Sequence, residues 1–242
     1  LQVAHLEAVA GDLEGALATL ERVQDRATSS AGYYAAPRLS LDIAVQLRDE
    51  DLLMSLLPTA ESYANRWGLQ RAVMARARLW WDRPLPSDGE GRSHDLAPGA
   101  EAVAILARWR LGRLGEEALS EARRSLARNP DAAAEGYLAL AVCLAQAGNH
   151  GAALDALEQA EKHLARHTAV DFRAHQTQKL LVACRARVQW SAGRHEAAAG
   201  LARRERGGMA DGLLPAILLD GVLEAWRARS TDGDRVRFRS DG

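Results

Sequence analysis

The stretch that decides the fold is AEGYLALAVCLAQAGNHGAALDALEQAEKHLARH, which runs from Ala134 to His167. Apolar residues recur at helical spacing on both sides of Gly148-Asn149, a pair that tolerates the left-handed backbone at a helix end. The two apolar stripes comprise Leu140, Ala141, Leu144 and Ala145, then Ala153, Leu154, Leu157, Ala160 and Leu164. Two amphipathic helices with so short a connection pack antiparallel. One hairpin cannot bury both of its faces, so the pattern predicts further hairpins around it.

This stretch resembles the tetratricopeptide repeat of about 34 residues. The matching positions are Tyr137 on the first aromatic, Leu140 and Ala141 on the Leu-Gly pair, Leu144 on the tyrosine, Ala153 on the small residue of the second helix and Leu157 on the following aromatic. Ala165 stands in place of the final proline. A small residue is expected at position 153 because a larger side chain would hold the two helices apart.

The composition favours close-packed helices in a protein that contacts neither membrane nor nucleic acid. Hydrophobic residues make up 48% of the 242 residues, whereas aromatic residues make up only 5%. This apolar content is mostly Ala and Leu, which suits helices better than a β-sandwich. A net charge of −1 predicts no general attraction to nucleic acid or to an anionic membrane. We therefore expect an all-α protein that works in the cytoplasm.

The two cysteines, Cys143 and Cys184, each lie within an apolar helical stripe. Such residues are typically small buried hydrophobes in a reducing cytosol. We therefore expect two free, buried thiols rather than a disulfide or a reactive group.

Similar helical patterns cover most of the remaining chain and predict a right-handed superhelix, or α-solenoid, over residues 1–229. The expected helices include 33–47 with Pro37 in the first turn, a helix from 49 that kinks or restarts at Pro58 and ends at Trp67-Gly68, and the helices 69–81, 100–111, 116–128, 172–191 and 212–229. Residues 83–99 hold three prolines and no apolar period, which predicts an irregular loop in place of a lost second helix. Residues 230–242 are expected to form a polar tail or linker.

At the level of the whole chain, the sequence resembles the helical repeat region of the large ATP-binding LuxR-type transcription regulators, the MalT-like group. Trp80-Trp81 before the proline-containing loop carries the resemblance, together with Ala107 to Arg113 leading into Glu117. The segment 235–238 also resembles the opening strand of a winged-helix effector domain. The resemblance implies a fragment that lies between an ATPase module and a DNA-binding module. The start of the chain within a helical pattern at Leu1 agrees with a fragment.

The first helices of stacked hairpins line the concave side of a superhelix, and this is where a ligand is expected. The repeat register places six residues there: Val103, Ala107, Arg110, Leu138, Val142 and Ala145. Arg110 is a candidate to bind an acidic group of a peptide or small effector, although a solvated arginine fits the pattern equally well. Most of the tryptophans have core spacing, but Trp109 and Trp190 lie near helix ends, from which they can also reach the groove.

The motifs of common enzymes are missing from the sequence, including the phosphate-binding loop and the nucleophile elbow. His163 and His167 lie four residues apart near Glu158 and Glu161, but a helix pair alone lacks the further ligands that zinc needs. We therefore expect no catalytic residue, no metal site and no cofactor.

Two functions follow from these observations. The first is a non-catalytic interaction or effector-sensing domain of a bacterial transcription regulator. The alternative is a free-standing tetratricopeptide scaffold for protein assembly. The expected partner is a protein or peptide, with a small-molecule effector or a second copy of the chain as further possibilities.

Overall fold

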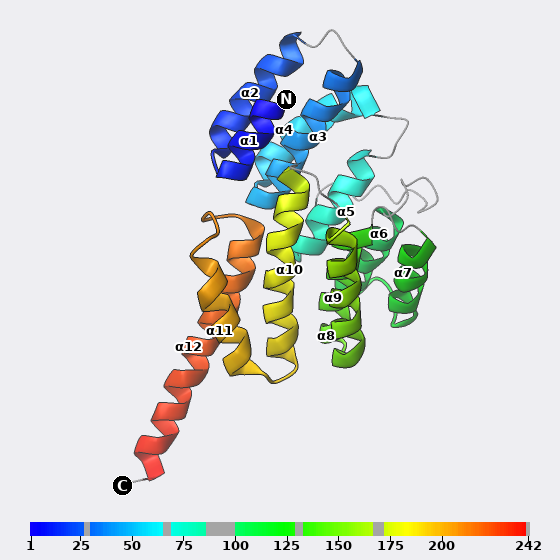
Figure 1. The fold of residues 1–242 in the computed structure, drawn as a ribbon. Helices are drawn as coiled ribbons and strands as arrows, with labels where there is room; N and C mark the ends of the chain where they lie inside the picture. Colours follow the sequence, from blue (N-terminus) through cyan, green and yellow to red (C-terminus); the bar gives the residue numbers. More distant parts are fainter. Residues whose placement is uncertain (27–29, 65–68, 86–99, 129–132, 167–171, 241–242) are drawn as a thin grey trace.

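The computed structural model describes residues 1–26, 30–64, 69–85, 100–128, 133–166 and 172–240, and its regular structure there is entirely helical (Figure 1). The twelve helices of these ranges are α1 (Gln2–Ala10), α2 (Leu13–Arg26), α3 (Ser30–Leu47), α4 (Glu50–Ala64), α5 (Leu69–Trp81), α6 (Ala100–Arg110), α7 (Glu117–Arg128), α8 (Ala133–Gln146), α9 (His150–Leu164), α10 (Phe172–Ser191), α11 (His195–Arg206) and α12 (Leu214–Ser240). The all-α class predicted from the sequence is therefore confirmed.

Five helices end in the same turn. The turn residue, which has positive φ, donates its N–H to the carbonyl three residues back, and the next residue donates to the carbonyl five residues back. The turn residues are Gly11, Arg48, Gly112, Gly148 and Gly193. This hydrogen-bond pattern satisfies carbonyls that a helix end leaves open. The chain then enters α2, α4, α7, α9 or α11, so each turn closes a hairpin of two helices.

Polar side chains begin the second helix after three of these turns. Asp12 accepts a hydrogen bond from the N–H of Gly15, and Asp49 accepts one from Leu52, both at 2.9 Å. Asn149 does the same for the N–H of Ala152 at 3.3 Å. An N-cap of this kind stabilises a helix by about 1 kcal/mol. Turn and cap together explain why the sequence around Gly148-Asn149 predicts the hairpin correctly.

Helices α5 and α6 are neighbours that run parallel, unlike the pairs within hairpins. At the end of α6, the side chain of Arg110 donates to the carbonyl of Leu79 near the end of α5, at 2.5 Å. The two C-terminal ends therefore lie side by side. The predicted irregular loop, residues 83–99, separates these two helices in the sequence. Its residues 86–99 lie outside the described part of the chain, whereas Leu85 is buried in the core.

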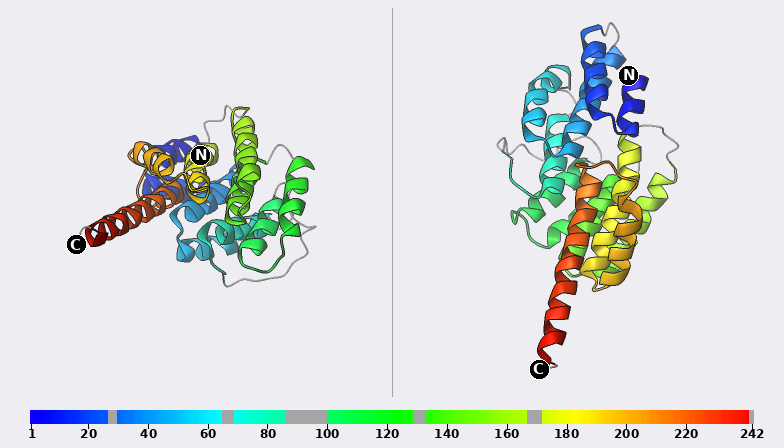
Figure 2. Two further views of the ribbon diagram at one scale, coloured as in Figure 1. Left: turned by 90° about the horizontal axis from the view of Figure 1, so that it is seen from below. Right: turned by 90° about the vertical axis from the view of Figure 1, so that its left-hand side faces the viewer.

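Helix α10 connects the first helices of the chain with the later helices α8, α9, α11 and α12 (Figures 1 and 2). It packs against α8, α9, α11 and α12, and its first turn reaches α1. Phe172 there is fully buried in a cluster that contains Ala4 and Ala8 of α1, Leu20 of α2 and Ile43 of α3. Helix α12 also contacts α3. The last helices of the chain therefore pack against the first ones.

Pro37 and Pro58 lie in the interiors of α3 and α4, and the position of Pro37 corrects the prediction. Helix α3 begins at Ser30, so Pro37 is in its interior rather than its first turn, and α4 continues through Pro58 to Ala64. The predicted end at Trp67-Gly68 lies outside the described residues. Proline removes one helical hydrogen bond. The residues around Pro37, such as Ala36 and Leu39, are buried, and this packing offsets the loss.

Helix α12 is longer than predicted. We expected it to end at Arg229 before a polar tail, but the helix continues to Ser240. The segment 235–238, which resembles the opening strand of a winged-helix domain, is therefore helical in this structure. Buried Leu214, Leu219 and Val222 anchor the first half of α12. Adding residues to a helix that has already nucleated costs little free energy. A prediction based on apolar spacing does not detect this extension, because the added residues need not be buried.

We expect Ala153→Trp to lower the free energy of unfolding by about 1–3 kcal/mol or more, because it overfills a close helix contact. Ala153 is fully buried on α9, the helix that packs against α8. Urea denaturation measures the effect. The matched control is Ala127→Trp, at an exposed position of α7. An unchanged midpoint for Ala153→Trp would show that the two helices do not meet at this residue.

Candidate functional site

The predicted groove residues are packed in the core. Five of them (Val103, Ala107, Leu138, Val142 and Ala145) are at most 6% exposed and belong to the main apolar cluster. The reason is that α6 packs against α5 and α8, while α10 packs against α8, so neighbouring helices cover these side chains. In this arrangement none of the five presents a surface to a ligand. Their role as the lining of a groove stays a prediction.

Arg110, the sixth predicted residue, already has partners for its charge. Its side chain is 2% exposed and forms an ion pair with Asp82 at 2.7 Å, besides the hydrogen bond to the carbonyl of Leu79. Trp109 and Trp190 are half-buried against the main core. The structure therefore places these three side chains in packing roles.

A buried ion network joins four helices that are distant in sequence. Arg76 of α5 donates from Nε to Glu135 of α8 at 2.8 Å, and it also pairs with Asp42 of α3. The indole of Trp80 donates to the same oxygen of Glu135 at 3.0 Å, and Arg173 of α10 pairs with the other oxygen at 3.1 Å. The side chains of Arg76, Asp42 and Glu135 are no more than 8% exposed. Two cations and two anions make the network neutral.

The electrostatics of this network keep Glu135 and Arg76 charged. Burial alone raises the pKa of Glu135, but the charges of Arg76 and Arg173 and the hydrogen bonds from Arg76 and Trp80 lower it to about 2. Burial likewise disfavours the charged form of Arg76, but Glu135 and Asp42 outweigh this and raise the pKa above its ordinary value. A carboxylate that stays ionised down to about pH 2 is a poor proton donor near neutral pH. The network is therefore suited to holding helices together rather than to acid–base chemistry.

Arg187 on α10 differs from these arginines. It is half-buried, and it makes no hydrogen bond or ion pair within the described part of the chain. Burial lowers its pKa, and the nearby charge of Arg110 lowers it further. The sequence pattern does not distinguish Arg187, because its spacing matches the ordinary charged face of a helix.

The two cysteines are buried and free, as predicted. Burial raises the pKa of both Cys143 and Cys184 to about 12. A thiol is nucleophilic only as the thiolate. Neither cysteine is therefore suited to serve as a nucleophile in the folded protein.

A thiol titration tests this burial. We expect the native protein to react with an aromatic disulfide reagent only as fast as it unfolds, and both thiols to react at once in denaturant. The raised pKa values also predict that stability is unaffected below pH 9, the ordinary thiol pKa, and falls as the pH rises from about 9 towards 12. Rapid labelling of native protein at neutral pH would contradict the packing of α8 against α10.

Metal ligation finds no support in the described residues, where no group of three or more His, Cys, Asp or Glu side chains is placed to hold an ion. The ring of His163 stacks on Tyr137 with 5.5 Å between the ring centroids, and His167 lies outside the described residues.

No helix in the described ranges is long and apolar enough to cross a bilayer.

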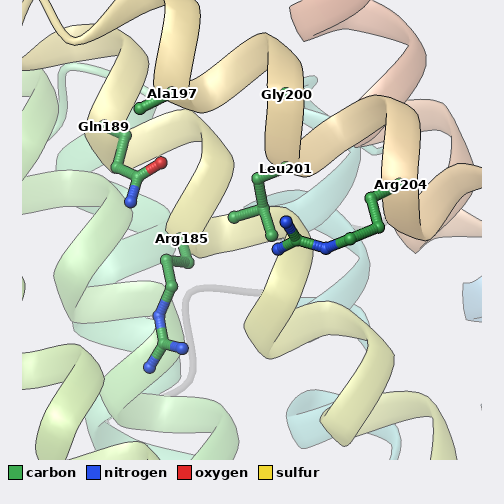
Figure 3. Close-up of a pocket in the computed structure, with 6 residues that line it drawn as sticks. All are labelled: Arg185, Gln189, Ala197, Gly200, Leu201 and Arg204. Carbon is green, nitrogen blue, oxygen red and sulfur yellow. The ribbon is translucent and has the colours of Figure 1, made fainter.

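An open hollow of about 450 Å³ lies between α10 and α11 (Figure 3). Arg185 and Gln189 of α10 line it, and Ala197, Gly200, Leu201 and Arg204 of α11 complete the lining. The four residues on α11 follow one helical stripe, since they lie at positions i, i+3, i+4 and i+7. Small residues at the first two positions leave the space open, and a methyl group added at Gly200 would meet no neighbouring atom within 4 Å.

The hollow carries two arginines that are only loosely engaged. Arg185 pairs with Glu161 of α9 at 3.0 Å, and Arg204 pairs with the adjacent Glu205 at 3.1 Å. All four side chains are at least 36% exposed, so each pair contributes little, on the order of 0–1 kcal/mol. Figure 3 shows Leu201 projecting from α11 between the two helices, with the guanidinium of Arg204 turned toward it.

Arg203, Arg204 and Arg206 form a charge run in the sequence, a pattern that usually marks a solvated helix face, and nothing in the sequence pattern distinguishes Arg185. The structure divides the run. Arg206 forms ion pairs with Asp211 and Asp220, whereas Arg203 lies over the ring of Trp226. Only Arg204 faces the hollow. The stripe of small residues on α11 is the sequence feature that indicates the hollow, but such a stripe is equally typical of close helix packing.

Fold and site together define an all-helical protein of αα-hairpins with a neutral buried network inside and a basic hollow outside. No protein-family model, curated protein or solved structure matches the chain.

Proposed function

We propose that this chain is a non-catalytic interaction or effector-sensing domain, built as a right-handed superhelix of tetratricopeptide-like hairpins. The observation that carries the proposal is the turn shared by five helix ends, from Gly11 to Gly193, each of which closes a hairpin. Repeated hairpins of this kind present extended surfaces that suit binding rather than chemistry. The ionised Glu135 and the two buried thiols agree with a non-catalytic role.

The proposed setting is a bacterial transcription regulator of the MalT-like group. The support comes from the sequence around Trp80-Trp81 and Ala107 to Arg113, and from the parallel pair α5 and α6, which lie as the first helices of two successive hairpins would. In such a protein the domain responds to a protein, peptide or small effector, and another module contacts DNA. The second candidate is a free-standing scaffold, which the repeated turn supports equally.

Partner selection followed by reconstitution tests the proposal. A two-hybrid selection against a fragment library of the source genome should yield a partner that also binds the purified chain in calorimetry. The matched control is Arg76→Met, which weakens the fold rather than the surface and should weaken binding only in proportion to the fraction unfolded. Failure of every selected partner to bind the purified chain would count against an interaction domain.

Sequencing the gene on both sides of this segment separates the two candidates. A regulator predicts a phosphate-binding loop on the upstream side and a helix-turn-helix on the downstream side. A gene without either module would favour the scaffold.

A further inference from the structure

We infer that the hollow between α10 and α11 binds an acidic peptide segment of a protein partner, with Arg185 and Arg204 as its carboxylate contacts. This inference rests on the proposed interaction function and names the chemistry of the partner. Charge complementarity favours it. The hollow presents two guanidinium groups from different helices and no acidic side chain among its lining residues.

The existing ion pairs of the two arginines are easy to replace. Glu161 and Glu205 are exposed, so moving them into water loses little free energy. A carboxylate of a bound peptide gives each guanidinium an equivalent partner, and the planar fork of arginine can hold both oxygens of that carboxylate. Glu161 therefore acts as a weak competitor that only a negatively charged ligand displaces.

The rest of the hollow suits a peptide. The side-chain amide of Gln189 makes no hydrogen bond within the described part of the chain, and its oxygen, Oε1, is buried. This amide can therefore turn toward a peptide main chain without losing a bond, and it has both a donor and an acceptor to offer. Leu201 provides an apolar contact between the arginines, and the space above Gly200 accepts a side chain.

Other anionic ligands fit less well. The hollow has walls from two helices and is open to solvent, whereas small-molecule sites commonly bury about 70–90% of their ligand. Nucleic acid binding requires an extended basic surface. Here the net charge of the chain is −1, and among the described residues the lining of the hollow contains only two basic ones, Arg185 and Arg204.

Fluorescence anisotropy with a defined probe tests the inference. The probe is a short fluorescein-labelled peptide that repeats the triplet Glu-Asp-Leu, and the control peptide repeats Gln-Asn-Leu. We expect the wild-type chain to bind the acidic peptide at low salt, more weakly at high salt, and to bind the neutral peptide at least about tenfold more weakly. Citrate and a single-stranded oligonucleotide serve as competitors and should displace the acidic peptide poorly.

Substitutions at glycines locate the site without loss of folding. Gly200→Glu places a carboxylate in the hollow, four residues before Arg204, and should weaken binding at least about tenfold. Gly200→Ala adds only a methyl group where no atom lies within 4 Å, and it should bind as the wild type does. Gly151→Glu on α9 is the matched control, because that glycine also has open space around it. Arg185→Gln combined with Arg204→Gln should reproduce the loss seen with Gly200→Glu.

Several outcomes would overturn the inference. Equal binding by Gly200→Glu would place the peptide elsewhere, and equal binding of the neutral peptide would remove the role of charge. Effective competition by citrate would assign the hollow to free carboxylates, and effective competition by the oligonucleotide would assign it to nucleic acid. If the acidic peptide does not bind but a selected partner does, the inference fails and the interaction function stands. If neither binds, both fail.

Discussion

Arg76→Met is expected to lower the free energy of unfolding by about 3–5 kcal/mol. The substitution removes the cation that lies between Asp42 and Glu135. Glu135 keeps its pairing with Arg173, but Asp42 loses the only ion pair that the described residues give it. A buried carboxylate without a partner is costly because the interior does not replace its hydration.

Urea denaturation monitored by tryptophan fluorescence measures the loss. Arg124→Met on α7 is the matched control, since Arg124 is exposed, and it should change stability by less than about 0.5 kcal/mol. Adding Asp42→Leu to Arg76→Met should recover part of the stability, because the stranded charge is then gone. If Arg76→Met and Arg124→Met have equal effects, the ion network is not buried as described.

Phe172→Ala is expected to cost about 3–5 kcal/mol and to loosen the first helices more than the last ones. Phe172 is the large side chain through which α10 joins the cluster of α1, α2 and α3. Its removal leaves a cavity among small residues such as Ala4 and Ala8, which cannot fill the space.

Hydrogen exchange combined with urea denaturation distinguishes this local effect from a general one. We expect the amides of α1 to α3 to lose protection in Phe172→Ala, while those of α8 and α9 keep most of theirs. Leu6→Ala on α1 is the control, because Leu6 is 57% exposed and its truncation removes little packing. Equal losses for Phe172→Ala and Leu6→Ala would mean that α10 does not anchor the first helices.

Local structure could be predicted well from the sequence. The bounds predicted for α5 and α10 agree with the structure, because apolar spacing and the flanking polar or glycine residues mark them clearly. The hairpin at Gly148 was also predictable, since glycine there adopts a φ of 79° that other residues avoid. Apolar spacing, flanking residues and turn glycines all depend on residues that are close together in the sequence, so the sequence alone contains this information.

Long-range packing could not be predicted in the same way. Arg76 and Glu135 are 59 residues apart, and neither differs by pattern from the many exposed charges of the chain. Apolar spacing shows that one face of a helix is buried but not which helix covers it. The repeat register predicts a groove at Val103, Leu138 and Val142, but it contains no sign of the neighbouring helices that pack against them.

The candidate site was missed for a related reason. Arg185 and Arg204 lie on different helices, and they face one hollow only because the turn at Gly193 folds α11 back along α10. The sequence contains the small residues that leave the hollow open, but it does not say which surface they face.

The helices α3, α5, α8 and α10 close on a buried ion network, and this is the feature on which the described packing depends most. Side-chain hydrogen exchange by nuclear magnetic resonance tests this packing directly, through the Nε–H of Arg76 and the indole N–H of Trp80. Both protons bond Glu135 in the structure, so both should exchange far more slowly than the guanidinium protons of exposed Arg124. Exchange of the Arg76 and Trp80 protons as fast as that of Arg124 would contradict the account.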